Sequence, residues 1–176
     1  MISRKIIYIR HGHDTRDKHK YDEILTSHGK KKVKELTKRL IDEHGIPDII
    51  YYSPYYRTRQ TKRIMLKVIY NHLKSENIEK ELTKLKCDWR LSRFFTKKQR
   101  SFPDIRKETE NRGAPIKEKW EDFKIRVNEQ LEEMEQSDYQ VIWCVTHTLV
   151  VNHVIKIKNI EHGYEIPYLD TVILTY

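Results

Sequence analysis

Residues 6 to 12 read Ile6-Ile7-Tyr8-Ile9-Arg10-His11-Gly12 and pass directly from an apolar run to a polar triplet. β-branched and aromatic side chains favour strands, and a short continuous apolar run is typical of a strand that is buried on both faces. The charged side chains and the glycine that follow indicate a loop. The segment therefore predicts a buried first strand whose end carries Arg10 and His11.

Helical and extended patterns alternate along the rest of the chain. Apolar residues recur with helical spacing from Val33 to Ile41, Thr26 or Ser27 can cap this helix, and Gly45 ends it. The other expected elements are, in chain order, a strand at 49–52, a helix with one face from Ile64 to His72, a strand at 83–87, a long amphipathic helix whose core-facing stripe runs from Ile116 through Trp120 to Met134, a strand at 141–145, a helix at 148–158 and a strand at 171–174. Strands that alternate with helices predict an α/β fold, here a three-layer α/β/α sandwich with a largely parallel central sheet.

The length of the chain sets the expected number of domains. A chain of 176 residues is long enough for one well-buried core and too short for two ordinary domains. We therefore expect a single domain over residues 1–176. Residues 88–115 show no clear period and contain a basic cluster, two prolines and a glycine, so we expect an irregular insertion or a lid there.

The composition limits the classes of partner. Apolar residues make up 38% of the chain and charged residues 35%, which is polar for a globular domain but not typical of a disordered tail. The formal net charge of +9 attracts phosphorylated metabolites, phosphoproteins or nucleic acid without choosing among them. The basic residues are dispersed, and those between Lys30 and Arg39 fit the solvated side of one helix better than a binding stripe. Since the aromatic residues fall mostly in apolar runs and no nucleic-acid recognition motif occurs, no nucleic acid partner is expected.

The cysteines and the hydropathy argue against three further classes of protein. Cys87 and Cys144 lie in or beside apolar runs without metal-ligand spacing, so the sequence predicts buried free thiols rather than a zinc site or a disulfide framework. No stretch approaches the roughly 20 apolar residues of a membrane span. We therefore expect a soluble protein in the cytoplasm.

Unusual polar groups follow three of the expected strands. They stand at residues 10–12, at residues 53–57 and at residues 146–147. The carboxyl ends of parallel strands form the ligand crevice of open α/β sheets, because successive loops converge there. The sequence thus predicts that two histidines and two arginines meet at one rim, as a set suited to binding an anion.

The same residues resemble the histidine phosphatase superfamily, which includes cofactor-dependent phosphoglycerate mutases and many broad phosphatases. The matching elements are the R-H-G triplet at 10–12, a D-x-x-L-T-x-x-G segment at 22–29, an S-P-x-x-R-T-x-Q-T block at 53–61 and Thr146-His147. R-H-G alone is weak evidence, but four elements in family order are strong evidence. The resemblance implies a phosphoglycerate mutase-like fold.

The resemblance also implies roles for four residues and no cofactor or metal. His11 is the nucleophile that becomes phosphohistidine, and Arg10, Arg57 and His147 surround the phosphoryl group. Fixed guanidinium groups suit the equatorial oxygens of that group, and a covalent intermediate splits one displacement into two. Arg59 and Gln60 are expected to be peripheral, while Arg90 and Arg93 fit either substrate contacts or solvent.

The chain departs from the family pattern at the residue that protonates the leaving oxygen. An L-x-E segment usually supplies this acid, and the nearest match here is Leu91-Ser92-Arg93. The family's Glu after the triplet and a nearby Asn are replaced by His13 and Asp17. Three explanations stay open: a carboxyl group of residues 88–115, namely Asp104, Glu108 or Glu110, takes the role; the substrate has a leaving group that needs no proton; or catalysis is impaired.

These observations favour a metal-independent phosphatase acting on phosphomonoesters, as small molecules or phosphoproteins. The alternatives are a catalytically impaired phosphate-binding pseudophosphatase and a phosphoglycerate mutase-type phosphotransferase. A barrel hydrolase with His11 and His13 as a metal pair would usually need about 250 residues. The sequence predicts neither the natural substrate nor the oligomeric state.

Overall fold

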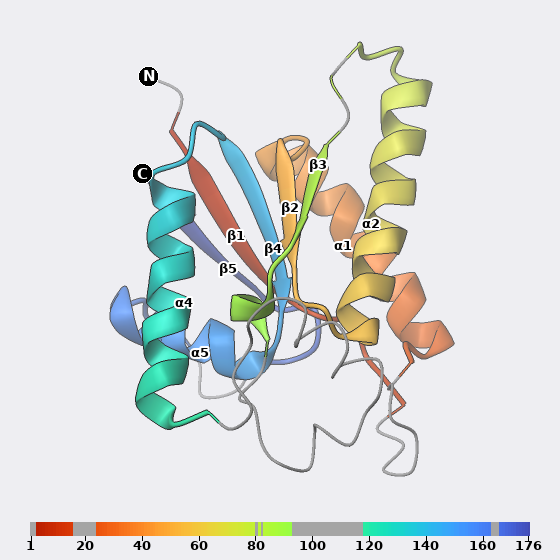
Figure 1. Cartoon of the computed structure of the whole chain (residues 1–176). Coiled ribbons are helices and arrows are strands. Elements are labelled where there is room, and N and C mark those ends of the chain that lie inside the picture. Colours follow the sequence, from red (N-terminus) through yellow and green to blue (C-terminus); the bar gives the residue numbers. More distant parts are fainter. Residues whose placement is uncertain (1–2, 16–23, 80, 82, 93–117, 163–165) are drawn as a thin grey trace.

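The computed structural model describes residues 3–15, 24–79, 81, 83–92, 118–162 and 166–176. Strands and helices alternate along these residues in the predicted order (Figure 1). The strands are β1 (Lys5–Arg10), β2 (Ile49–Tyr52), β3 (Lys84–Cys87), β4 (Val141–Thr146) and β5 (Thr171–Thr175). The helices are α1 (Ser27–His44), α2 (Tyr56–Ser75), the short 3₁₀ helix η1 (Trp89–Leu91), α4 (Trp120–Glu135) and α5 (Thr148–Ile157).

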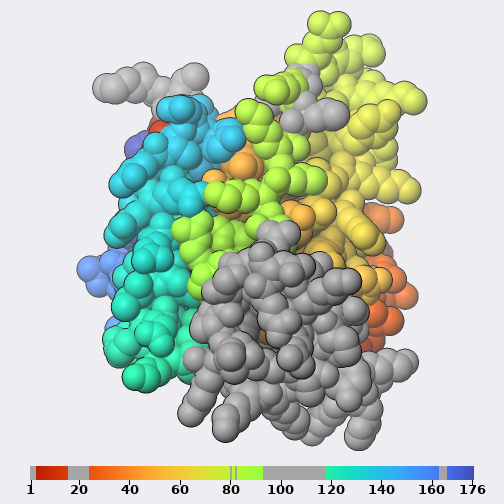
Figure 2. All heavy atoms as spheres, in the orientation of Figure 1, coloured from red at the N-terminus to blue at the C-terminus, as the bar shows by residue number. Residues whose placement is uncertain are grey.

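The five strands form one sheet in the order β3-β2-β4-β1-β5. Parallel pairing joins β3 to β2, β2 to β4, and β4 to β1, whereas β5 runs antiparallel to β1. The predicted largely parallel sheet is therefore confirmed, with one antiparallel strand at its edge. β3 is the opposite edge, and its side chains lie at the surface between α4 and α2 (Figure 2).

Side chains on the two faces of the sheet build two apolar layers, because successive residues of a strand point to opposite faces. Ile6 and Tyr8 of β1 belong to the cluster that includes the buried residues of α4 and α5. Ile7 and Ile9 belong to the cluster that includes those of α1 and α2. The first strand is thus buried on both faces as predicted, and the three-layer α/β/α sandwich is confirmed.

Helix α1 begins and ends as its sequence predicts. Thr26 is the N-cap, and its hydroxyl oxygen accepts a 2.9 Å hydrogen bond from the backbone N–H of Gly29. Gly45 follows the helix with φ +82°, a conformation that glycine adopts without strain, and its N–H donates to the carbonyl of Ile41. The first turn of α1 is thereby fixed beside the loop that follows β1.

Two expectations need correction. Helix α4 begins at Trp120 rather than at 116, and the Trp120 side chain is exposed and stacks on Phe123 instead of joining the core. A local hydrogen bond from the N–H of Lys119 to the carboxylate of Asp122 sets this start. Of the two thiols expected to be buried, Cys144 is buried and burial raises its pKa well above the usual value, whereas Cys87 at the sheet edge is half-buried.

Gly29 is required by a close approach between α1 and the loop after β1. A methyl group at Gly29 would lie 2.3 Å from the backbone oxygen of His13, so the loop would have to move. We expect Gly29→Ala to lower the free energy of unfolding by about 1–3 kcal/mol, which is the usual range for overpacking. Urea unfolding measures this change. The control is Lys30→Ala at the neighbouring exposed position, for which surface substitutions predict a change within about 0.5 kcal/mol. Equal stability of the two variants would contradict the close approach.

Candidate active site

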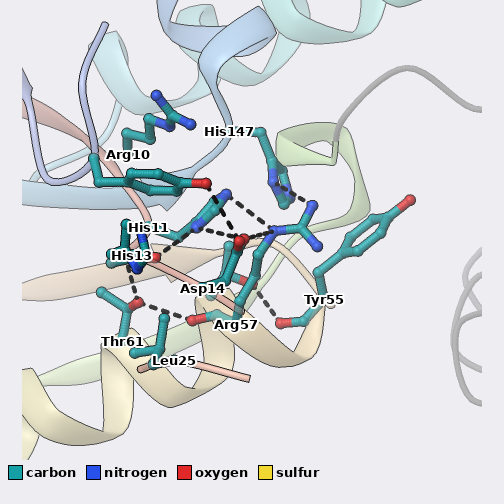
Figure 3. Close-up of polar contacts among 12 residues, drawn as sticks. Arg10, His11, His13, Asp14, Leu25, Tyr55, Arg57, Thr61 and His147 are labelled. Atoms are coloured by element: carbon teal, nitrogen blue, oxygen red, sulfur yellow. Dashed lines mark hydrogen bonds and ion pairs between the residues drawn. The ribbon is translucent and has the colours of Figure 1, made fainter. Parts of the chain in front are cut away.

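Three loops at the carboxyl ends of parallel strands bring His11, Arg57 and His147 together (Figure 3). His11 directly follows β1, Arg57 lies in the first turn of α2 after β2, and His147 directly follows β4. All three side chains are buried, with exposed fractions of 4%, 5% and 3%. Their convergence was predicted from the order of strands and loops alone.

The hydrogen bonds of His11 determine which ring nitrogen carries its proton. The Nε of Arg57 lies 3.0 Å from Nε2 of His11, and a guanidinium can only donate. Nε2 therefore accepts, and the proton of the neutral ring is on Nδ1, which lies 3.0 Å from the carbonyl oxygen of Gly12. This tautomer leaves the lone pair on Nε2, the nitrogen that faces the arginine.

The same reasoning applies to His147 on the other side of Arg57. Nη2 of Arg57 lies 3.3 Å from Nδ1 of His147, which must accept, so neutral His147 donates through Nε2 to the hydroxyl of Ser53 at 2.9 Å. The rings of His11 and His147 lie edge to face with centroids 5.3 Å apart. Arg57 thus bridges two imidazoles, both of which present an acceptor nitrogen to it.

Arg10, the fourth predicted residue, adopts a different orientation. Its guanidinium lies 3.9 Å over the ring of Tyr168 and donates to the carbonyl of Ile166. Figure 3 shows the Arg10 side chain above His11 and apart from the guanidinium of Arg57. The structure therefore places Arg10 at the rim of the site, against the segment that precedes β5.

A carboxylate that the sequence reasoning missed lies in the centre of the site. Asp14 is 3% exposed, and its Oδ2 lies 3.7 Å from both Nδ1 of His11 and Nε of Arg57. The hydroxyl of Tyr168 donates to Oδ1 of Asp14 at 3.3 Å. The only sequence signal for Asp14 was a charged residue three positions after the histidine. Tyr168 had none, because its place depends on how the chain returns to β5.

The block at residues 53–61 holds the loops of the site in place. The N–H of Gly12 donates to the hydroxyl of Thr61, which in turn donates to the carbonyl of Arg57. The side-chain oxygen of Gln60 accepts from the N–H of Leu25. Gln60 therefore has the peripheral, structural place that was expected for it.

The remaining candidates divide into residues with other partners and residues outside the described ranges. The guanidinium of Arg90 pairs with Asp88 at 2.7 Å and with Glu133, which gives it a structural role at the foot of η1. Ser92 is fully buried, and its hydroxyl lies 3.4 Å from that of Ser53. Asp17, Arg93 and the candidate acids Asp104, Glu108 and Glu110 lie outside the described residues, as does most of the segment expected to be an insertion or a lid.

His11 and His13 have different partners in the structure. Nδ1 of His13 lies 3.1 Å from the hydroxyl of Thr26, and its exposed ring packs edge to face on Tyr168. Within the described ranges, no group of three or more His, Cys, Asp or Glu side chains is arranged to hold a metal ion. In the same part of the chain, no helix combines the length and apolar character needed to cross a membrane.

The sequence profile of the histidine phosphatase superfamily (branch 1) matches residues 6–162. The chain belongs to this superfamily. The match includes His11, Arg57 and His147, which the structure brings together. A search of curated protein sequences finds no match to this chain.

Solved structures show that the fold is that of phosphoglycerate mutase-like members of the superfamily. The phosphoglycerate mutase of Bacillus anthracis superimposes with a TM-score of 0.69 at 15% identity, over 99% of this chain and 88% of the other. The mycobacterial glucosyl-3-phosphoglycerate phosphatase gives 0.66 at 13% identity, over 98% and 90%. A candidate phosphohistidine phosphatase, SixA of Agrobacterium tumefaciens, gives 0.54 at 11% identity, over 97% and 90%. At these identities the similarity establishes the fold and not the substrate.

Proposed function

We propose that this chain is a metal-independent phosphatase that hydrolyses phosphomonoesters, on small molecules or on proteins, through a phosphohistidine formed on His11. The observation that carries the proposal is the pair of hydrogen bonds of His11, from which its tautomer follows. Its Nδ1 faces the carbonyl of Gly12, and its Nε2 lone pair faces the guanidinium of Arg57. A buried imidazole with its lone pair beside an arginine is arranged to attack a phosphorus atom whose oxygens the arginine holds.

In the first step, a phosphate oxygen replaces Nε2 of His11 as the acceptor of the hydrogen bond from Nε of Arg57. The lone pair of Nε2 is then free to react. The lone pair forms an N–P bond, and the P–O bond to the leaving group breaks with its electron pair on the leaving oxygen. In the second step, water attacks phosphorus and releases one proton, the N–P bond breaks, and its electron pair returns to Nε2; the released proton balances the one that the leaving oxygen takes up. The net reaction is hydrolysis to inorganic phosphate and an alcohol or phenol.

Arg57 and His147 supply the groups that stabilise the transferring phosphoryl group. Because the transition state of phosphoryl transfer is loose, the protein contributes mainly by positioning the reactants and by neutralising charge. Arg57 offers fixed donors to two oxygens, and His147, held by Ser53, lies 3.3 Å from the same guanidinium. Arg10 would have to leave Tyr168 to join them, and its place at the rim allows it to act when substrate binds.

The replacement of the family's usual acid favours substrates with good leaving groups. In the segment that corresponds to L-x-E, the position of the acid is taken by Arg93, which lies outside the described residues, and the neighbouring Ser92 is buried with its hydroxyl 3.4 Å from that of Ser53. General acid catalysis is typically worth about 10²–10⁴-fold for a poor leaving group, and aryl phosphates or phosphohistidine need it least. This supports a phosphatase over a mutase acting on sugar-type alcohols. Asp104, Glu108 and Glu110 remain the candidate acids if the substrate is an alkyl phosphate.

The test is hydrolysis of para-nitrophenyl phosphate by the purified protein in the presence of EDTA, from about pH 5 to 8, the range that spans histidine titration. We expect turnover that is insensitive to the chelator. Hydrolysis that EDTA abolishes and zinc or magnesium restores would contradict the metal-independent mechanism. Phosphate binding without turnover would instead support the impaired phosphate-binding alternative, which the replacement of the usual acid by Arg93 favours.

A further inference from the structure

We propose that Asp14 is a positioning residue for this reaction, and this proposal rests on the function proposed above. Its carboxylate holds His11 and Arg57 in their reactive arrangement and stabilises the positive charge that His11 acquires when its Nε2 is phosphorylated. Neither the resemblance to the family nor the matching sequence elements assigned a role to this residue.

The backbone fixes Asp14 inside the site. Residues 13–15 pair antiparallel with residues 24–26, through hydrogen bonds of 3.0 Å from the N–H of Thr15 to the carbonyl of Ile24 and from the N–H of Thr26 to the carbonyl of His13. Asp14 is therefore anchored on both sides within a loop that directly follows the nucleophile. Only 3% of Asp14 is exposed, so its carboxylate contacts protein groups instead of water.

Those partners are the reacting groups and one phenol. Oδ2 lies 3.7 Å from Nδ1 of His11 and 3.7 Å from Nε of Arg57, while Oδ1 accepts from the hydroxyl of Tyr168. Figure 3 shows Asp14 beneath His11 and beside Arg57, at the meeting point of the dashed lines. A buried carboxylate in an anion-binding site opposes phosphate binding, so its place here requires a compensating effect on another step.

The compensating effect follows from the charges during the first step. Neutral His11 carries its proton on Nδ1, and when the lone pair of Nε2 forms the N–P bond the ring becomes a cation. The Nδ1–H then faces the carbonyl of Gly12 at 3.0 Å and the carboxylate of Asp14 at 3.7 Å. A negative charge beside an imidazole that turns positive stabilises the charged state, as the aspartate of a Ser-His-Asp triad does.

Charge on Asp14 therefore affects binding and chemistry in opposite directions. It repels the incoming phosphate, which weakens binding, and it stabilises the phosphoimidazolium, which speeds the step. A residue with a merely structural role would not separate these effects, because its loss would weaken binding and turnover together.

The experiment compares wild type and Asp14→Asn by steady-state hydrolysis of para-nitrophenyl phosphate and by inhibition with inorganic phosphate. We expect kcat to fall by roughly 10- to 100-fold, less than the roughly 10⁴-fold for a triad aspartate because 3.7 Å is longer than a hydrogen bond. We expect the inhibition constant for phosphate to stay the same or to decrease. Tyr168→Phe removes the hydrogen bond to Oδ1 but keeps the charge of Asp14, so we expect it to lower kcat less than Asp14→Asn does.

Asp14→Glu keeps the charge and serves if Asp14→Asn does not fold; it should retain more of kcat than any neutral replacement that folds, such as Asp14→Ser. Unchanged kcat in a folded Asp14→Asn, or equal losses of kcat and phosphate binding, would overturn the role of Asp14 while leaving the phosphatase intact. A wild type that binds phosphate without turnover overturns the proposed function, and the role of Asp14 with it.

Discussion

Replacing His11 by glutamine is expected to reduce the hydrolysis of para-nitrophenyl phosphate by about 10⁴-fold or more, because removing a covalent nucleophile usually abolishes the chemical step. Glutamine is close in size to histidine, and its side-chain oxygen can accept the hydrogen bond that Arg57 now gives to Nε2. The site should therefore remain packed while it loses the lone pair that attacks phosphorus.

The matched control for this prediction is His13→Gln, two residues along the same loop. His13 is exposed and contacts Thr26 and Tyr168, outside the cluster of His11, Arg57 and His147. We expect this variant to keep most of the wild-type kcat. If His11→Gln folds normally and still turns over at a rate close to that of wild type, His11 is not the nucleophile. Loss of activity in both variants, together with wild-type activity that EDTA abolishes and zinc restores, would support the metal-pair alternative.

The second large effect is expected for Arg57→Lys. Arg57 contacts both histidines and lies against Asp14, and lysine retains the charge but not the planar set of donors that spans these groups. We expect kcat/KM to fall by about 10²–10³-fold, as is typical when one preorganised donor to a developing charge is lost. Phosphate inhibition should weaken in parallel, in contrast to the expected behaviour of Asp14→Asn.

Arg63→Lys is the matched control, because it makes the same replacement on the exposed side of α2, away from the site. It should not change kcat/KM by more than about twofold. Arg57→Ala is less informative, since it would leave the buried carboxylate of Asp14 without its arginine, and breaking such a pair can cost about 3–5 kcal/mol of stability. A folded Arg57→Lys enzyme with the kcat/KM of wild type would contradict the assigned role of the guanidinium.

The fold was predictable wherever local signals agreed with the tertiary environment. The apolar run at residues 6–9 predicted a strand that is buried on both faces. Thr26 and Gly45 marked the two ends of α1, because capping depends only on neighbouring residues. Trp120 fits the helical spacing of the apolar residues that follow it, which predicted a place in the core. It is exposed, however, because it is the first residue of α4. The orientation of β5 was not predictable, since antiparallel pairing with β1 depends on the path of the chain before it.

The candidate site was predictable to the extent that strand order determines it. His11, Arg57 and His147 follow parallel strands and therefore meet at one edge of the sheet. The orientation of Arg10 and the place of Tyr168 depend on the segment before β5, for which the sequence offered no local signal. Arg90 illustrates the same limit, because its partner Glu133 comes from α4, 43 positions away.

The central claim, a covalent phosphohistidine on His11, is tested most directly by trapping it. The wild-type protein is mixed with excess para-nitrophenyl phosphate, denatured within milliseconds in alkali, digested and analysed by mass spectrometry. We predict a phosphoryl group on the peptide that contains His11, stable in alkali and lost in acid as a phosphoramidate is, and absent from His11→Gln. A phosphoryl group on another residue, or steady turnover without any phosphorylated peptide under conditions that capture other phosphoramidates, would contradict it.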